Sequence, residues 1–181
     1  MEKVLLYITV FLTIGLYSCL HVEEKPQPKI ITHYSDFEEL SKWDEMQGKI
    51  TTREARSGKH STYVDTSSGY SAIYFVKIKD LSPKGFSKLK AEAFFRLNSD
   101  SSHALMIMEV WDSTMNKLDY KTFNIHHEVK HPRIWTKKTW EIDLEKYWKK
   151  DDEIMVRFYM NHFIGALDIT FMDDLRIEYI P

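Results

Sequence analysis

Alternation of apolar and polar residues is the strongest pattern in this chain. In "EIMVRFYMNH" every second side chain from Ile154 to Met160 is apolar. In "KLKAEAFFRLN" the same holds from Leu89 to Leu97. A period of two residues is typical of a strand that buries one face. The same pattern predicts strands in "SAIYFVKIK", "ALMIMEVWD", "DYKTFNIHH", "KTWEIDL" and "LDITFMDDLRIEYI".

Turn-forming segments separate these predicted strands. They are "SPKG", "NSDSS", "DSTMNK", "KHPR" and "KKDDE". Many short strands at this spacing predict an all-β sandwich. A helix is expected only in "SDFEELSKW", where Ser35 or Asp36 could cap the first turn.

The N-terminus has a different pattern. The run from Val4 to Leu16 is apolar or neutral throughout. It is shorter than the roughly 20 residues that a membrane-spanning helix needs. With Lys3 before it, the run has the length and the charge of a signal-peptide core.

The only cysteine, Cys19, follows this run in the sequence "LYSC". These four residues resemble the lipobox of bacterial lipoproteins, although Tyr17 departs from the usual small residue. The resemblance implies that residues 1–18 are a signal peptide and that Cys19 carries the lipid. A lone cysteine forms no internal disulfide, so lipidation gives it a use. A buried core cysteine and a membrane-spanning helix are the alternatives.

Residues 19–29 are mixed in charge and contain prolines, which predicts an extended tether. Glu23 and Glu24 resemble the surface-export signal of Bacteroidetes lipoproteins; a plain solvated linker is the alternative. The resemblance implies an outer-membrane lipoprotein that faces the periplasm or the cell surface. Residues 30–181 remain for a single domain.

Composition and the absence of known motifs reduce the number of function classes to consider. Hydrophobic residues make up 43% and aromatic residues 14%, which is enough for one core. The formal net charge of −2 lacks the basic character expected of a nucleic-acid-binding protein. No G-x-S-x-G, GxGxxG or Walker pattern is present, so no enzyme class is indicated. In "NIHHEVKHPR", His126 and His127 are expected to point to opposite faces of a strand, which disfavours a zinc site with His131 and Glu128.

Four segments in order resemble galactose-binding-like jelly rolls, a fold that includes many carbohydrate-binding modules. They are "DFEE" followed by Trp43, "EARSGKHSTYVD", "WTKKTWEIDLEKYWKKDDEIMVRFYMN" and "LDITFMDDLRIEYI". Together they cover most of Tyr34 to Ile180. The resemblance implies a β-sandwich jelly roll. It says less about function, because this fold carries many functions.

The resemblance also implies one structural Ca²⁺. Its ligands would be Glu38, the backbone around Lys59, and Asp173 or Asp174. Calcium prefers six to eight oxygen ligands at about 2.3–2.6 Å. The alternative is that the two aspartates are solvated turn residues.

A ligand platform is expected on one sheet face. Arg157, Tyr159 and Asn161 alternate with the core side chains of their strand. The charge of Glu109 indicates that its face, shared with Trp111, is not the deep core. Aromatic and polar side chains together can stack on a sugar and bind its hydroxyls. In the alternative, Arg157 and Glu109 form a cross-strand ion pair and Trp111 covers an edge.

Three further tryptophans have different expected roles. Trp135 follows "KHPRI" in a loop and is a candidate binding residue. Trp140 alternates with apolar residues and is expected in the core. Trp148 is expected to pack beneath its own connection.

Taken together, these patterns predict a membrane-anchored lipoprotein with a non-catalytic β-sandwich that binds a glycan or polysaccharide at the cell envelope. A structural or protein-interaction module of an envelope assembly is one alternative, with another envelope protein as its partner. A small glycan lyase or hydrolase is the other.

Overall fold

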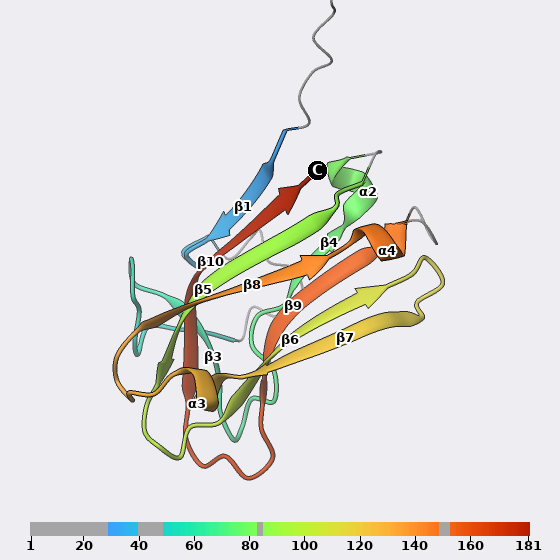
Figure 1. The fold of residues 1–181 in the computed structure, drawn as a ribbon. Coiled ribbons are helices and arrows are strands. Elements are labelled where there is room, and N and C mark those ends of the chain that lie inside the picture. The colour runs from blue at the N-terminus through green and yellow to red at the C-terminus, as the bar shows by residue number, and fades with distance from the viewer. Residues whose placement is uncertain (1–28, 40–48, 83–84, 149–152) are drawn as a thin grey trace, which may run out of the picture.

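The computed structural model describes residues 29–39, 49–82, 85–148 and 153–181. Within these ranges the chain forms two antiparallel sheets stacked face to face (Figure 1). The predictions for residues 1–28, including the signal peptide and Cys19, lie outside the described residues, as does Trp43.

One sheet has six strands in the order β2-β3-β10-β5-β8, and β1 also pairs with β10. Its strands are β1 (Ile31–Ser35), β2 (Ile50–Thr51), β3 (Ser61–Val64), β5 (Lys88–Leu97), β8 (Thr136–Asp143) and β10 (Thr170–Ile180). The other sheet has four strands in the order β4-β9-β6-β7. These are β4 (Tyr74–Lys77), β6 (Ala104–Trp111), β7 (Lys117–Asn124) and β9 (Met155–His162). Among the described residues, the short helices α2 (Ile78–Leu81), α3 (Ile125–Glu128) and α4 (Glu145–Trp148) follow β4, β7 and β8.

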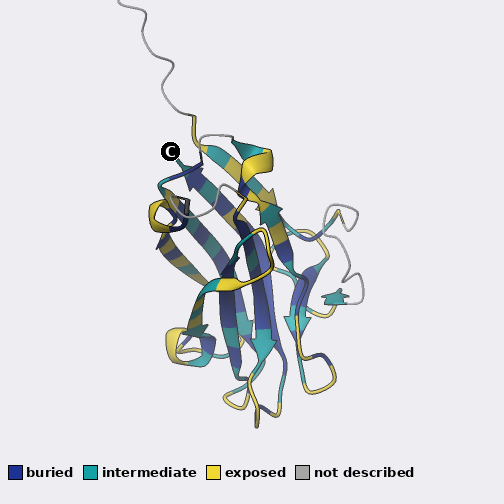
Figure 2. Ribbon diagram, turned by 90° about the vertical axis from the view of Figure 1, so that its right-hand side faces the viewer, coloured by how far each residue is buried: buried dark blue, intermediate teal, exposed yellow. Residues whose placement is uncertain are grey.

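The core lies between the two sheets. Alternate residues of β5 and β9 are buried there, as their sequence period predicts: Leu89, Ala91, Ala93, Phe95, Leu97, Val156, Phe158 and Met160. Figure 2 shows this alternation as buried and more exposed bands along the strands. The hydroxyls of Tyr74 and Tyr179 lie 2.7 Å apart and join the two sheets within the core.

The all-β sandwich jelly roll predicted from the sequence is confirmed. Each of the seven segments with apolar–polar alternation contains a strand, and Trp140 is buried in the core, 7% exposed. The first strand lies earlier than the resemblance implied, because β1 ends at Ser35, before "DFEE".

The predicted helix that begins at Ser35 or Asp36 is wrong over the described residues. Phe37 has φ = 59°, which is the left-handed region and is incompatible with a right-handed helix. The two expected capping residues instead close tight turns. The Ser35 hydroxyl accepts a hydrogen bond from the Phe37 N–H, and the Asp36 carboxylate accepts one from the Glu38 N–H. The side chains expected to cap a helix therefore stabilise turns at this position.

The two ends of the sandwich differ. The start of β1 and the C-terminus lie at the upper end in Figure 1, and the β9–β10 loop lies at the lower end. Over the residues that the structure describes, no helix is long and apolar enough to cross a membrane.

Candidate functional site

The outer face of the four-stranded sheet gathers the side chains that the sequence singled out. Strand β6 pairs with β9 so that Glu109 lies opposite Arg157 and Leu105 lies opposite Asn161. Directly opposite residues project from the same face. Tyr159 and Trp111 follow with the same period of two. The structure therefore brings all five platform residues onto one face.

A row of alternating rings and cations crosses this face. The Arg157 guanidinium lies 5.5 Å from the ring centroid of Phe75 and 5.0 Å from that of Trp111. The Lys117 ammonium lies 5.2 Å from the Trp111 ring and 4.7 Å from the Tyr120 ring. Cations near ring faces are attracted by the ring quadrupole. The contacts hold the aromatic side chains in place across all four strands.

Beneath this row, buried side chains form the floor of the face, and Glu109 is one of them. It is only 5% exposed. The Lys117 ammonium pairs with its carboxylate at 2.7 Å, and the Trp111 indole N–H donates a hydrogen bond to it at 3.0 Å. The expected ion pair with Arg157 does not form. The carboxylate faces strand β7 instead, where Lys117 compensates for the cost of burying its charge.

Tyr159 lies beside Glu109 in the floor and is 8% exposed. Burial, followed by the charge of the Glu109 carboxylate, raises the pKa of the Tyr159 hydroxyl far above its usual value. The Tyr159 ring also packs edge-on against Tyr70, with 5.7 Å between the ring centroids. The hydroxyl thus stays protonated at any physiological pH, and the Glu109 carboxylate is its hydrogen-bond partner.

Three exposed aromatic side chains stand around the floor. Tyr70 and Phe75 are each 46% exposed, and Tyr120 is 47% exposed. Sequence reasoning missed all three, and also Lys117. The signal for Phe75 was present, because it alternates with Lys77 and a lysine marks a solvated face. For Tyr70 there was none, since it precedes β4 and reaches the face through a single bridge to Asn161.

The remaining tryptophans do not extend this face. Trp135 directly precedes β8, which is an edge strand of the six-stranded sheet. It therefore belongs to a different part of the sandwich from Trp111. The side chain of Trp148 lies outside the described residues.

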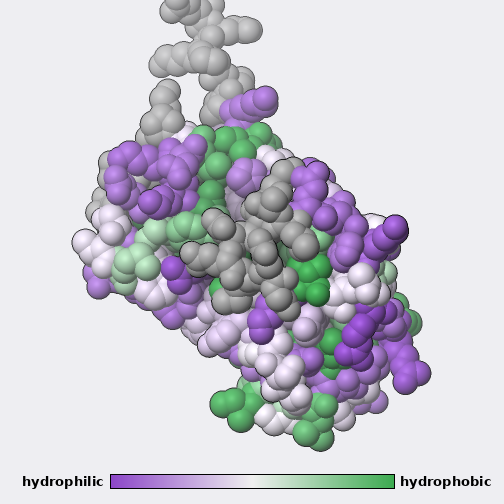
Figure 3. Space-filling model, turned by 180° about the vertical axis from the view of Figure 1, so that it is seen from behind, coloured by the Kyte–Doolittle hydropathy of each residue, from purple (hydrophilic) through white to green (hydrophobic). Residues whose placement is uncertain are grey.

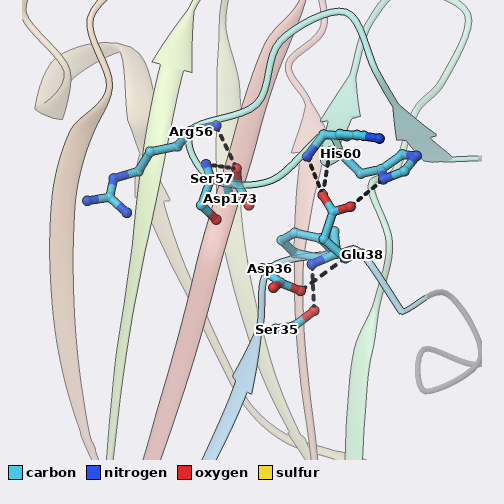
Figure 4. A network of polar contacts seen from close by, with 9 residues as sticks. Ser35, Asp36, Glu38, Arg56, Ser57, His60 and Asp173 are labelled. Carbon is cyan, nitrogen blue, oxygen red and sulfur yellow. Dashed lines mark hydrogen bonds and ion pairs between the residues drawn. The ribbon is translucent and has the colours of Figure 1, made fainter.

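The predicted calcium ligands lie in a network of hydrogen bonds (Figure 4). One Glu38 oxygen accepts from the backbone N–H groups of Lys59 and His60, both at 2.6 Å. The other lies 2.9 Å from the His60 ring nitrogen. The side-chain bond from His60, followed by the backbone bond from Lys59, lowers the pKa of Glu38. Gly58 permits the close approach, since a Cβ there would lie 2.4 Å from a Glu38 oxygen.

The two aspartates of β10 are also engaged. Asp173 accepts from the backbone N–H groups of Arg56 at 2.7 Å and of Ser57 at 3.2 Å. Asp174 accepts from the Arg56 guanidinium at 2.5 Å, the Ser57 hydroxyl at 2.6 Å and the Tyr34 hydroxyl at 2.5 Å. A register shift in β10 begins at Asp173, and Asp174 has φ = 50°. This irregularity turns both carboxylates toward the Arg56–Ser57 segment.

This arrangement does not fit a calcium ion. The carboxylates receive N–H and O–H donors, whereas a cation needs oxygen atoms that converge with free lone pairs. Over the described residues, no group of three or more His, Cys, Asp or Glu side chains could hold a metal ion. Asp173 and Asp174 are 0% and 6% exposed, so they are not solvated turn residues either. Calcium binding at Glu38, Asp173 and Asp174 stays a prediction.

The histidines near the lower end form a stack. His126 and His127 lie in α3, so the expectation that they sit on a strand is wrong. The His126 ring stacks on His103 with 4.0 Å between the ring centroids. Burial, followed by the charge of His126, lowers the pKa of His103. Stacked rings do not direct their nitrogens at a common point, so the pair is not arranged as metal ligands.

A small pocket lies between the sheets where β7 and α3 meet β5 and β8. It has a volume of about 160 Å³ and is lined by Phe95, Phe123, Ile125, Glu128, Lys138, Thr139 and Trp140. Ligand sites for small molecules usually have volumes of about 300–1,000 Å³. The pocket is too small for a sugar chain. The outer face of the four-stranded sheet is the candidate site because exposed rings and polar groups gather on it.

Several solved structures resemble this fold. The CBM22-1 xylan-binding domain from Paenibacillus barcinonensis Xyn10C is 14% identical, with 72% of this chain and 79% of that chain covered and a TM-score of 0.47. The xylan-binding module CBM15 is 8% identical, with 83% and 97% covered and a TM-score of 0.49. The enzymatically active domain of Bacteriophage CBA120 tailspike protein 4 is 6% identical, with 83% and 18% covered and a TM-score of 0.48.

These likenesses are distant and concern the fold alone. No protein-family model matches the chain, and no curated protein matches it.

Proposed function

We propose that this chain binds glycan without catalysis on the outer face of the β4-β9-β6-β7 sheet, and that a lipid on Cys19 anchors it to a bacterial outer membrane. The observation that carries the binding role is the set of exposed rings around a polar floor. Tyr70, Phe75 and Tyr120 offer ring faces to a sugar's C–H groups. Tyr159 and Asn161 offer groups that bind hydroxyls.

Non-catalytic binding agrees with the chemistry of this face. Glycoside hydrolases use two carboxyl groups that flank the scissile bond. Within the four described strands of this sheet, Glu109 is the single carboxylate on the outer face, and Lys117 and Trp111 already engage it. A lyase needs a free base near the substrate. The Tyr159 hydroxyl stays protonated and therefore does not supply that base.

A glycan array tests the binding role. The full chain, purified in detergent, is applied to an array of plant, algal and bacterial polysaccharides. We expect binding to at least one polymer, and we expect the Tyr120→Ala variant to lose about tenfold in affinity, or about 1.4 kcal/mol. Silence across the whole array would contradict the proposal.

The membrane anchor has a separate test, because Cys19 lies outside the described residues. Cells that express the chain are labelled with a palmitate analogue. The wild-type chain should take up the label and fractionate with the outer membrane, and the Cys19→Ser variant should do neither. Equal labelling of both chains, or of neither, would remove the anchor from the account.

A protein partner is the second candidate, and one observation favours it. The β9–β10 loop exposes Ile164 at 94%, Leu167 at 78% and Phe163 at 45%. Figure 3 shows hydrophobic surface at the lower end of the molecule, where this loop lies. Exposed apolar clusters often mark protein contacts. Cross-linking in intact cells should lose a specific adduct in an Ile164→Ser, Leu167→Ser variant if this candidate is correct.

A further inference from the structure

Arg157 has an unusual environment on the outer face of the four-stranded sheet. Its guanidinium lies between two rings, 5.5 Å from the centroid of Phe75 and 5.0 Å from the centroid of Trp111. Ring contacts of this kind use the flat faces of a guanidinium. The N–H groups lie along its edge and stay available for hydrogen bonds. The two ring contacts therefore hold the side chain in position, and Arg157 is partly exposed.

The described residues provide no hydrogen-bond acceptor for those donors. Within the part of the chain that the structure describes, no hydrogen bond or ion pair involves the Arg157 side chain. Its cross-strand neighbour is Glu109, which would be the obvious partner. That carboxylate is taken by the Lys117 ammonium and the Trp111 indole. Lys117 thus occupies the carboxylate that lies opposite Arg157, and no other described residue accepts from the guanidinium.

The charge on this face is positive. Lys77, Lys117 and Arg157 project from it, and Glu109 is the single carboxylate that the four described strands place there. The other acidic residue of these strands, Asp119, alternates with Tyr120 and bonds to Lys146 and Tyr147. A ligand on this face therefore meets a net positive charge, although the whole chain has a formal charge of −2.

We propose that the glycan is acidic, and that Arg157 binds the carboxylate of a uronic acid residue in it. A guanidinium and a carboxylate are both planar, and they pair through two parallel N–H···O bonds. Phe75 and Trp111 orient the guanidinium before the ligand arrives, which lowers the entropic cost of binding. The inference rests on the proposed glycan-binding function, and it adds the chemical class of the ligand and the residue that reads it.

Matched polymers test this inference. The full chain, purified in detergent, is measured by biolayer interferometry against polygalacturonate and glucuronoxylan. Each polymer is paired with its own carboxyl-reduced form, so that only the charge differs. Dextran sulfate controls for unspecific attraction between charges. We expect at least tenfold tighter binding to an acidic polymer than to its reduced form, and weaker binding to dextran sulfate.

Variants assign the preference to one side chain. Arg157→Gln should abolish the difference between the acidic and the reduced polymer, whether or not affinity for the reduced form also falls. Arg157→Lys keeps the charge but loses the planar fork, so it should recover only part of the difference. Lys77→Gln removes a charge from the same face without a ring sandwich, and it should keep most of the preference. Thermal unfolding of each variant confirms that the fold is intact.

The outcomes distinguish the carboxylate-binding role of Arg157 from the proposed glycan-binding function. Equal binding to acidic and reduced polymers would overturn the inference and leave the glycan-binding function standing. Binding to dextran sulfate as tight as to a polyuronate would overturn the carboxylate assignment. A loss of preference in Lys77→Gln equal to that in Arg157→Gln would overturn the role of Arg157. Failure to bind any polymer of the wider array would contradict the proposed function itself.

Discussion

At the residue scale, single side chains are fixed by contacts that lie far apart in the sequence. Glu38 binds backbone groups 21 and 22 residues away, and Asp173 binds backbone groups more than 100 residues away. Local sequence cannot reveal such partners. The motif resemblance singled out Glu38, Asp173 and Asp174 as one set, and the structure gives each of them N–H or O–H partners.

Gly58 offers a direct test of this network. Its φ of 60° and the 2.4 Å approach of Glu38 leave no room for a side chain. We expect Gly58→Ala to lower the free energy of unfolding by about 1–3 kcal/mol. Gly69→Ala is the matched control, because nothing lies within 4 Å of its Cβ position. Urea denaturation measures both variants, and equal stabilities would contradict the network.

The raised pKa of Asp173 predicts that the stability of the fold depends on pH. Burial raises the pKa of its carboxyl group from 3.8 to about 6. Between about pH 4 and pH 6 the folded state therefore holds more protons than the unfolded state, and its stability falls as the pH rises. The stability difference between wild type and Asp173→Asn should decline across this window by up to about 3 kcal/mol. A difference that stays constant from pH 4 to pH 7 would exclude this titration.

At the element scale, the pattern of alternation predicted which strands exist and which faces they bury. It succeeded for β5 and β9 because a sandwich core selects every second side chain. It could not predict strand order, and so it could not show that Phe75, Arg157, Trp111, Lys117 and Tyr120 form one row. It failed at Ser35 to Glu38, where residues that favour helix caps also favour turns.

The β6–β7 pairing carries a prediction of its own. Glu109 is buried, and Lys117 is its cationic partner. Removing that cation in Lys117→Met leaves a buried carboxylate without charge compensation, which should cost about 1–2 kcal/mol of stability. Lys79→Met is the control, since Lys79 and Glu153 are both about half exposed and such pairs contribute little. Equal effects of the two substitutions in urea denaturation would contradict the role of Lys117.

At the scale of the whole molecule, the two sheets have different outer surfaces. The six-stranded sheet carries exposed ion pairs such as Lys137–Glu92 and Arg176–Glu178. The four-stranded sheet carries the rings and Arg157, whose guanidinium pairs with no carboxylate among the described residues. The two surfaces differ in chemistry, and this difference favours a ligand on the four-stranded sheet.

The arrangement around Glu38 and Asp173 also predicts a response to metal. Because these carboxylates already hold N–H donors, millimolar Ca²⁺ and EDTA should give the same thermal midpoint within about 1 °C. Differential scanning fluorimetry measures it. A rise of several degrees with Ca²⁺ alone would show that the ligands reorganise around an ion, in support of the calcium prediction.

Glycan binding by the outer face is tested most directly by a comparison of three aromatic substitutions in one titration series. Phe75→Ala and Tyr120→Ala remove exposed rings from the face, and Phe163→Ala removes an equally exposed ring from the β9–β10 loop. With a polymer that binds on the array, the first two should weaken affinity about tenfold each, and Phe163→Ala should leave it within about twofold of wild type. Full affinity in the first two variants, or a loss only in Phe163→Ala, would contradict the account.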